Sequence, residues 1–339
     1  MKPISESGLK TISIFLIILT ILSFFLGFYI DETATNGYVD LNWIQKNIKI
    51  FLDNSILDAI KHPEYFGNRS PLMYIIHSLF NPFLENTYYY RITVFLFSIS
   101  GPILFFLCLK NKYKENENIL LILISTIILL SPYYRSSAFW GLEENYAVIF
   151  TFLSFLSLNA FLSNNEVKNF YSYFIIFLIA LSSSLCIYFD QKYLLIPLIS
   201  YISVILSKKS LKYKIFLTLI YFLFALPYLY LFLIWGGINP PLTAAENPNS
   251  ITQLSRISNL YFPHIGYAIT MIAFYLFPMI FFMRKNIREH YHDLLGARLN
   301  LFLISLFIVY LFYLIIFFNY EEFTTTNYWI GLGYIHKLS

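Results

Sequence analysis

The feature that most constrains the fold is an uncharged hydrophobic stretch near the amino terminus. Residues 11–30 run for 20 positions without Asp, Glu, Lys or Arg, about the length that one helical crossing of a bilayer requires. Asp31 and Glu32 follow directly. The stretch is too long for a cleaved signal peptide, and Phe28-Tyr29-Ile30-Asp31 lacks the small residues of a cleavage site. We therefore expect a membrane anchor that ends in a pair of carboxylates.

The composition extends this expectation to the whole chain. Of the 339 residues, 58% are hydrophobic and only 12% are charged, against about 25% charged residues in a soluble domain. The predicted fold is an all-α polytopic membrane protein with one domain over residues 1–339 and about nine transmembrane helices. Hydropathy predicts these spans at 11–30, 88–109, 118–134, 145–162, 170–189, 193–206, 215–235, 265–283 and 300–318.

The first loop, residues 31–87, is the longest loop on its side. Its segment 41–52 places Ile44, Ile48, Phe51 and Leu52 at helical spacing. The apolar segment 71–84 has prolines at positions 71 and 82 and is too short for a span. We expect both segments to form interfacial or re-entrant helices within this loop.

Basic residues set the expected orientation. Five segments (1–10, 110–117, 163–169, 207–214 and 284–299) total 49 residues and hold 14 Lys and Arg, whereas the 120 residues of the opposite face hold 8. By the positive-inside rule the amino terminus is cytoplasmic and the other face is external, periplasmic or lumenal. The basic residues are spread over several loops, which argues against a nucleic-acid partner.

Acidic residues gather on the expected external face, which holds 13 of the 19 acids, and the predicted spans hold no acid in their interiors. This pattern argues against an ion-coupled transporter, which needs ionisable groups near the bilayer midplane. Four short segments carry the charges to the external ends of spans: 29–33, 62–74, 133–145 and 188–193. If these spans are neighbours, their charges face one cavity.

Such a set of charges suits sugar transfer from a polyprenyl phosphate. The leaving phosphate needs a nearby cation rather than a general acid. The acceptor hydroxyl needs a carboxylate base within hydrogen-bonding reach. One acid and one or two Arg or Lys residues at the depth of a lipid headgroup are sufficient.

Four elements follow one another along roughly residues 9–235: Asp31-Glu32 after the first span, Pro71-Leu72-Met73-Tyr74 near the end of the first loop, Arg91 at the start of the next span, and Ser131-Pro132-Tyr133-Tyr134-Arg135 before Glu143-Glu144. In this order they resemble the membrane glycosyltransferases of the C superfamily (GT-C), such as protein O-mannosyltransferases, bacterial aminoarabinose transferases and dolichyl-phosphate-glucose transferases. Many of these enzymes have Lys-Pro-Pro where this chain has Arg69-Ser70-Pro71. Many are also longer, so a truncated or minimal member is expected.

The resemblance implies an inverting glycosyltransferase that uses a polyprenyl-phosphate-linked sugar as donor and a lipid, glycan or protein as acceptor. Asp31 is the expected catalytic base, with Glu32 as its neighbour. The expected substrate-binding residues are Arg69, Tyr74, Arg91, Arg135, Glu143, Glu144, Asp190 and Lys192. No cofactor is assigned, and a divalent cation (Mg²⁺ or Mn²⁺) held near Glu144 and Asp190 stays open.

Plainer interpretations stay open for each of these residues. The acids after the first span can be polar residues that flank it, and Glu143-Glu144 can complement a helix macrodipole. Arg135 and Lys192 can be interface anchors, and Asp190 can belong to a simple turn. The main alternative function is a lipid or polysaccharide carrier or flippase without catalysis. A membrane acyltransferase would need a buried His with a polar partner, which no predicted span offers.

The charge asymmetry predicts the topology. A reporter fused after Lys212 should be cytoplasmic, and one fused near Asn247 should be external. Paired reporters that are active only inside or only outside the cell test both positions. A reversed signal at either position would place every candidate site residue on the wrong face.

Overall fold

A computed structural model describes residues 6–32, 37–67, 69–113, 118–163 and 169–237, with Pro240, Leu242, Ser305 and Val309 in addition. The chain divides into two compact units, Met1–Ile251 and Thr252–Ser339, and the helices discussed here belong to the first. Every regular element in the described ranges is a helix, which confirms the all-α class for these residues. The expected spans 265–283 and 300–318 lie outside the described residues, and the single domain over 1–339 stays a prediction.

Five helical segments are long and apolar enough to cross a membrane. They are α1 (Glu6–Tyr29), α5 and α6 together (Thr87–Ser98 and Ser100–Lys112), α9 (Glu144–Ser163), α10 (Asn169–Phe189) and α12 (Leu211–Trp235). Each lies at a predicted span. Several such helices in one chain indicate a multi-pass membrane protein.

The expected span 118–134 is bent. Helix α7 (Asn118–Thr126) continues into the 3₁₀ helix η1 (Ile127–Leu130), and α8 (Pro132–Trp140) then departs at 67°. Pro132 cannot donate a backbone hydrogen bond to the preceding turn, and Ser131 caps the new helix through the backbone N–H of Tyr134. The pair makes a sixth candidate span if it counts as one.

The expected span 193–206 is a shorter apolar helix. The 3₁₀ helix η2 (Gln191–Leu194) runs into α11 (Leu195–Leu206), and the two together are shorter than the usual crossing length of about 20 residues. The described residues therefore contain five or six candidate spans, and the count of nine stays a prediction.

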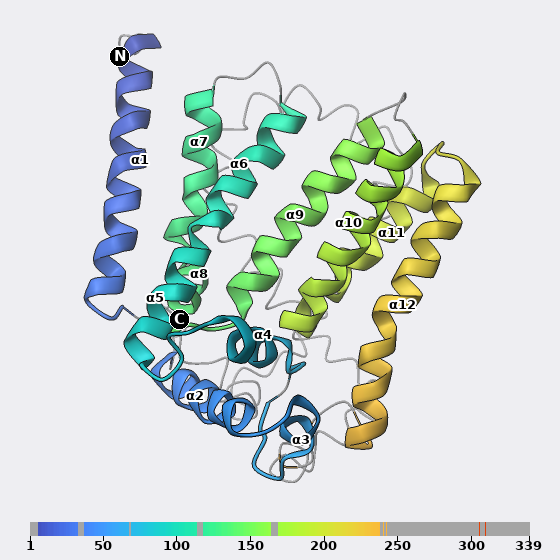
Figure 1. Ribbon diagram of the computed structural model, residues 1–339. Helices are drawn as coiled ribbons and strands as arrows, with labels where there is room; N and C mark the ends of the chain where they lie inside the picture. The colour runs from blue at the N-terminus through green and yellow to red at the C-terminus, as the bar shows by residue number, and fades with distance from the viewer. Residues whose placement is uncertain are drawn as a thin grey trace. The chain divides into compact units, whose positions relative to one another are not determined.

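Three short helices of the first loop gather at one end of this unit: α2 (Gly37–Asp53), α3 (Ile56–Lys61) and α4 (Leu72–Phe80) (Figure 1). Helix α2 is amphipathic as expected and buries Leu41, Ile44, Ile48 and Phe51. Leu52, expected on the same face, is exposed. Helix α4 has nine residues, about 14 Å at 1.5 Å per residue, so it cannot cross a bilayer alone.

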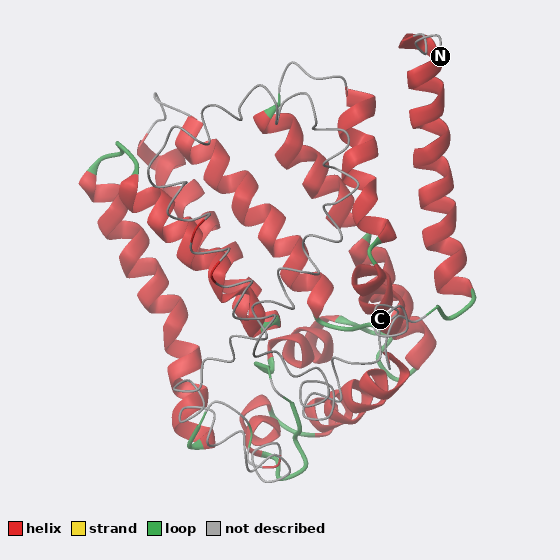
Figure 2. Ribbon diagram, turned by 180° about the vertical axis from the view of Figure 1, so that it is seen from behind, coloured by secondary structure: helices red, strands yellow, loops and turns green. Residues whose placement is uncertain are grey.

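Burial differs strongly among the long helices. Half of the apolar window of α10 is buried, against 17% for α1 and 11% for α12. Helices α1 and α12 lie at the outer edges of this unit in both views (Figures 1 and 2). Their exposed side chains are mostly large and apolar, as expected for surfaces that face lipid.

The candidate site residues and the lysine-rich helix ends lie at opposite ends of this unit. Helix α1 ends, α9 begins and α10 ends at the same end as α2–α4 (Figure 1). The end of α6 with Lys110 and Lys112 and the turn between α11 and α12 lie at the opposite end. This arrangement is compatible with the predicted topology, and which end lies outside the cell stays a prediction.

Gly141 ends α8 and packs closely against Tyr90 of α5. It has φ +68°, and an added Cβ would lie 2.6 Å from Cε1 of Tyr90. Gly236 ends α12 with φ +65°, and there an added Cβ would have no described atom within 4 Å. Backbone strain alone should cost either alanine variant roughly 1–2 kcal/mol, and crowding should cost Gly141→Ala about 1–3 kcal/mol more.

The apparent Tm of purified protein in detergent measures the difference. Gly141→Ala should unfold at a clearly lower temperature than Gly236→Ala, which serves as the matched control. Equal Tm values for the two variants would contradict the close packing of Tyr90 on Gly141.

Candidate functional site

The end of α1 positions the first acid pair. The backbone N–H of Glu32 donates to the carbonyl of Gly27 at 2.9 Å, and that of Asp31 donates to Phe28 at 3.3 Å. This is the hydrogen-bond pattern of a Schellman motif, which usually places Gly in the left-handed position. Asp31 occupies that position with φ +53°. Aspartate tolerates this conformation better than most residues, and its side chain turns toward α5.

Asp31 binds Arg91 of α5, with 2.5 Å between the carboxylate Oδ1 and Nη2. Arg91 is nearly buried, donates from Nε to the carbonyl of Phe139 at 2.6 Å, and lies 4.4 Å from the ring centre of Trp140. The side chain of Asp31 stays 59% exposed. The pair therefore joins the end of α1 to α5 and α8.

Glu32 binds Arg135 of α8 in a bidentate pair, with oxygen–nitrogen distances of 2.8 and 2.6 Å. Arg135 is 8% exposed and also donates to the backbone carbonyls of Ser23 at 2.8 Å and Leu129 at 3.2 Å. The indole N–H of Trp140 donates to the carbonyl of Glu32. These contacts satisfy a buried guanidinium and fix α8 against α1.

Gly27 permits this close approach. A Cβ there would lie 2.6 Å from Oε2 of Glu32 and would also clash with the guanidinium of Arg135 and the ring of Phe139. The site needs glycine at this position for the space that it leaves.

Arg69 joins the first loop to the start of α9. Its two terminal nitrogens contact Oε1 of Glu143 at 2.5 Å and Oε1 of Glu144 at 2.6 Å. The neighbouring Ser70 hydroxyl donates to the carbonyl of Tyr188 at 2.6 Å. Burial alone would lower the pKa of Arg69, but the two carboxylates raise it overall. Arg69 therefore carries a positive charge and holds two adjacent acids together.

Asp190 follows α10 and is almost completely buried. Its Oδ1 accepts the backbone N–H of Lys192 at 3.0 Å and so caps η2. Its Oδ2 makes no hydrogen bond, and Nζ of Lys192 lies 3.8 Å away, too far for a hydrogen bond. The side chain of Lys192 is 76% exposed. One buried carboxylate oxygen of Asp190 therefore accepts no hydrogen bond and lies beside a largely exposed lysine side chain.

A cavity of about 530 Å³ collects part of this set. Three of the expected residues line it: Glu144, Asp190 and Lys192. Asp40 of α2 also lines it and was not predicted as a site residue, although it precedes the amphipathic segment 41–52. The other lining residues are Ile128, Ser131, Tyr133, Tyr134, Ser136, Ser137, Leu142, Asn145, Val148 and Tyr193. The volume is in the range of small-molecule sites.

The remaining expected residues do not line this cavity. Asp31, Glu32, Arg91 and Arg135 form the two ion pairs at the end of α1, and Arg69 and Glu143 form the bridge beside the cavity. Tyr74 is buried in the core, where its ring contacts those of Phe51 and Tyr65. Glu32 does contact Arg135, so the charged segments 29–33 and 133–145 meet, whereas no residue of 29–33 or 62–74 lines the cavity.

His77 lies outside the predicted spans, and the sequence favours a packing or interface role for it over a catalytic one. His77 of α4 shares a hydrogen bond of 2.9 Å between Nε2 and the hydroxyl of Tyr146, and its Nδ1 lies 3.0 Å from Nδ2 of Asn81. Burial lowers the pKa of His77 to about 4. The neutral ring therefore connects α4 to α9 as a packing residue.

Metal binding receives no support from the described part of the chain. Among those residues, no three His, Cys, Asp or Glu side chains converge into a metal-binding group. A divalent cation near Glu144 and Asp190 is therefore not assigned.

Fold and site together define an α-helical, multi-pass membrane protein with a cavity lined by four charged residues at one end of its helices. Comparisons with protein-family models, with curated proteins and with solved structures found no match. The function is therefore argued from the site itself.

Glu143 should make stability depend on pH. Burial raises its pKa to about 7, above the ordinary 4.5, because Arg69 offsets burial only in part and Glu144 adds repulsion. Between pH 4.5 and about 7 the folded state then binds more protons than the unfolded state, so the free energy of unfolding falls as the pH rises. The stabilising contribution is complete below pH 4.5 and is lost through pH 7.

The apparent Tm of wild type and Glu143→Gln, measured from pH 4 to pH 8, tests this sign. The wild type should lose Tm relative to the variant as the pH rises through this window. Glu64→Gln removes an exposed glutamate of the first loop and should keep the wild-type profile. A gain in wild-type Tm relative to Glu143→Gln over the same window would contradict the assignment.

Proposed function

We propose that this protein is a membrane glycosyltransferase that moves a sugar from a polyprenyl-phosphate donor to an acceptor hydroxyl at one membrane surface. The observation that supports it is the combination in one cavity of a buried carboxylate oxygen of Asp190 without a hydrogen bond and the exposed side chain of Lys192. These are the two groups that such a transfer needs.

The free oxygen favours Asp190 as the base. Glu144 also lines the cavity, but its Oε1 is engaged by Arg69 and its Oε2 lies 3.4 Å from the hydroxyl of Ser137. Asp31, the base expected from the sequence, holds Arg91 and lies outside the cavity lining. Of Asp31, Glu144 and Asp190, it is Asp190 that lines the cavity with a buried oxygen that accepts no hydrogen bond.

The proposed step is an inverting displacement at the anomeric carbon. The acceptor oxygen attacks this carbon while Oδ2 of Asp190 takes the hydroxyl proton. The bond from the anomeric carbon to the phosphate oxygen breaks, and the polyprenyl phosphate leaves with the electron pair beside Lys192. The exposed lysine side chain can follow this charge as it develops.

The ion pairs around the cavity hold in place the helix ends that form its wall. Arg69 holds Glu143 and Glu144 at the start of α9, and Ser70 ties the same loop to the end of α10. Arg91 and Arg135 anchor α1 and α8 through Asp31 and Glu32. In this proposal these groups hold the cavity wall, and of the cations expected to bind substrate it is Lys192 that keeps this role.

Transfer by the full-length protein in vesicles tests the proposal, with a panel of labelled polyprenyl-phosphate sugars and membrane extract as the acceptor source. Asp190→Asn keeps the size and the cap of η2 but removes the proton acceptor, so transfer should fall roughly 10²–10⁴-fold. Asp31→Asn keeps its hydrogen bond to Arg91 and should retain transfer within about tenfold. Asp53→Asn removes an exposed acid of α2 and is the matched control.

The outcomes separate the roles. A large loss in Asp31→Asn with little change in Asp190→Asn would keep the transferase and return the base to Asp31. Wild-type protein that transports labelled donor or polysaccharide across the bilayer without transferring any sugar of the panel would overturn the enzyme and support a carrier.

A further inference from the structure

The turn between α11 and α12 concentrates positive charge. Lys208, Lys209, Lys212 and Lys214 lie within seven residues, which we call the basic turn. No Asp or Glu occurs from residue 191 to residue 245, so neither adjoining helix supplies a carboxylate. Two of the lysines lie in the first turn of α12, where cations oppose the helix macrodipole unless an anion is near.

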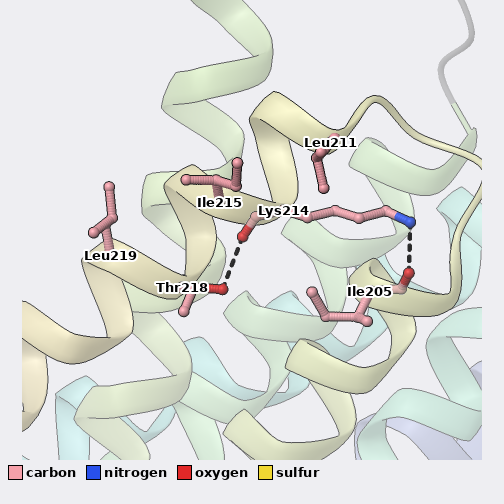
Figure 3. Close-up of a pocket in the computed structure, with 6 residues that line it drawn as sticks. All are labelled: Ile205, Leu211, Lys214, Ile215, Thr218 and Leu219. Carbon is pink, nitrogen blue, oxygen red and sulfur yellow. Dashed lines mark hydrogen bonds between the residues drawn. The ribbon is translucent and has the colours of Figure 1, made fainter.

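An apolar cavity of about 360 Å³ adjoins the basic turn (Figure 3). Leu211, Ile215 and Leu219 of α12 line it at intervals of four residues, so they form one stripe along the helix. All three side chains are more than half exposed. Ile205 of α11 closes the cavity on the other side.

Lys214 links the charge to this cavity. Its side chain extends across the cavity, and its Nζ donates to the carbonyl of Ile205 at 2.6 Å (Figure 3). An ammonium has three donors, so Lys214 can donate to the carbonyl of Ile205 and also to an anion at the cavity rim. The hydroxyl of Thr218 donates to the carbonyl of Lys214 at 2.9 Å and leaves the stripe apolar below that rim.

We propose that this surface binds one anionic glycerophospholipid of the surrounding bilayer. Its headgroup phosphate contacts Lys208, Lys212 and Lys214, and one acyl chain lies along Leu211, Ile215 and Leu219. The charge complements an anionic headgroup, and the stripe continues from the basic turn into a helix that faces lipid. A free phosphate would use the lysines but not the stripe.

The full-length protein in a neutral detergent tests the proposal by native mass spectrometry with phosphatidylglycerol and phosphatidylcholine of equal chain length. The wild type should bind phosphatidylglycerol more tightly, and salt should weaken the preference. Lys208→Gln, Lys212→Gln and Lys214→Gln combined should weaken phosphatidylglycerol binding by on the order of 100-fold, from about fivefold per lysine. Replacing the same three lysines by arginine keeps the charge and should keep the preference for phosphatidylglycerol.

Two further sets of variants, measured in the same way, locate the bound lipid. Lys110→Gln combined with Lys112→Gln neutralises another basic helix end at the same end of the unit and should leave the preference unchanged. Ile215→Ser combined with Leu219→Ser makes the stripe polar and should weaken binding of the long-chain lipid at unchanged charge.

Three results would overturn the proposal. The first is equal binding of the two lipids by the wild type. The second is an unchanged preference in the glutamine variant. The third is full competition by glycerol 3-phosphate at the lipid's own concentration, which would show that only the headgroup is recognised.

Discussion

Arginine side chains pair with carboxylates from distant segments, and these pairs organise the helix ends around the cavity. Arg69, Arg91 and Arg135 each lose most of their contact with water, and a buried cation is tolerated only when its charge and its donors are satisfied. The partners come from other parts of the chain: Asp31 and Glu32 from the end of α1, and Glu143 and Glu144 from the start of α9. These pairs fix the helix ends around the cavity.

The same rule explains which groups stay available for chemistry. A carboxylate oxygen that already accepts a hydrogen bond from a guanidinium is not available to take the proton of a substrate hydroxyl. Asp190 differs because no guanidinium in the described part of the chain is hydrogen-bonded to its second carboxylate oxygen, and the ammonium of Lys192 lies 3.8 Å from that oxygen. The cavity therefore combines rigid walls with one free oxygen and one adaptable cation, and the proposed transfer reaction depends on that contrast.

Much of this arrangement follows from the sequence and part of it does not. Length and apolarity predict the helices, and the charge pattern predicts that Glu32 and the segment around Arg135 meet. Pairing depends on geometry that a sequence does not contain. Asp31 turns toward Arg91 because it takes a left-handed cap position, and Arg135 reaches Glu32 because Gly27 leaves room. The 67° bend at Ser131 brings Glu144 to the cavity and Asp40 joins it from α2, so membership of the site depends on tertiary contacts.

Positive charge at the two ends of the described unit lies in different surroundings. Near the cavity, cations are matched by carboxylates of the same chain, and the charges are neutralised before the helices enter the apolar region. At the basic turn the two adjoining helices supply no acid from residue 191 to residue 245, while their outward stripe is apolar and open. The anionic lipid proposed for this surface supplies both a phosphate for the lysines and hydrocarbon for the stripe.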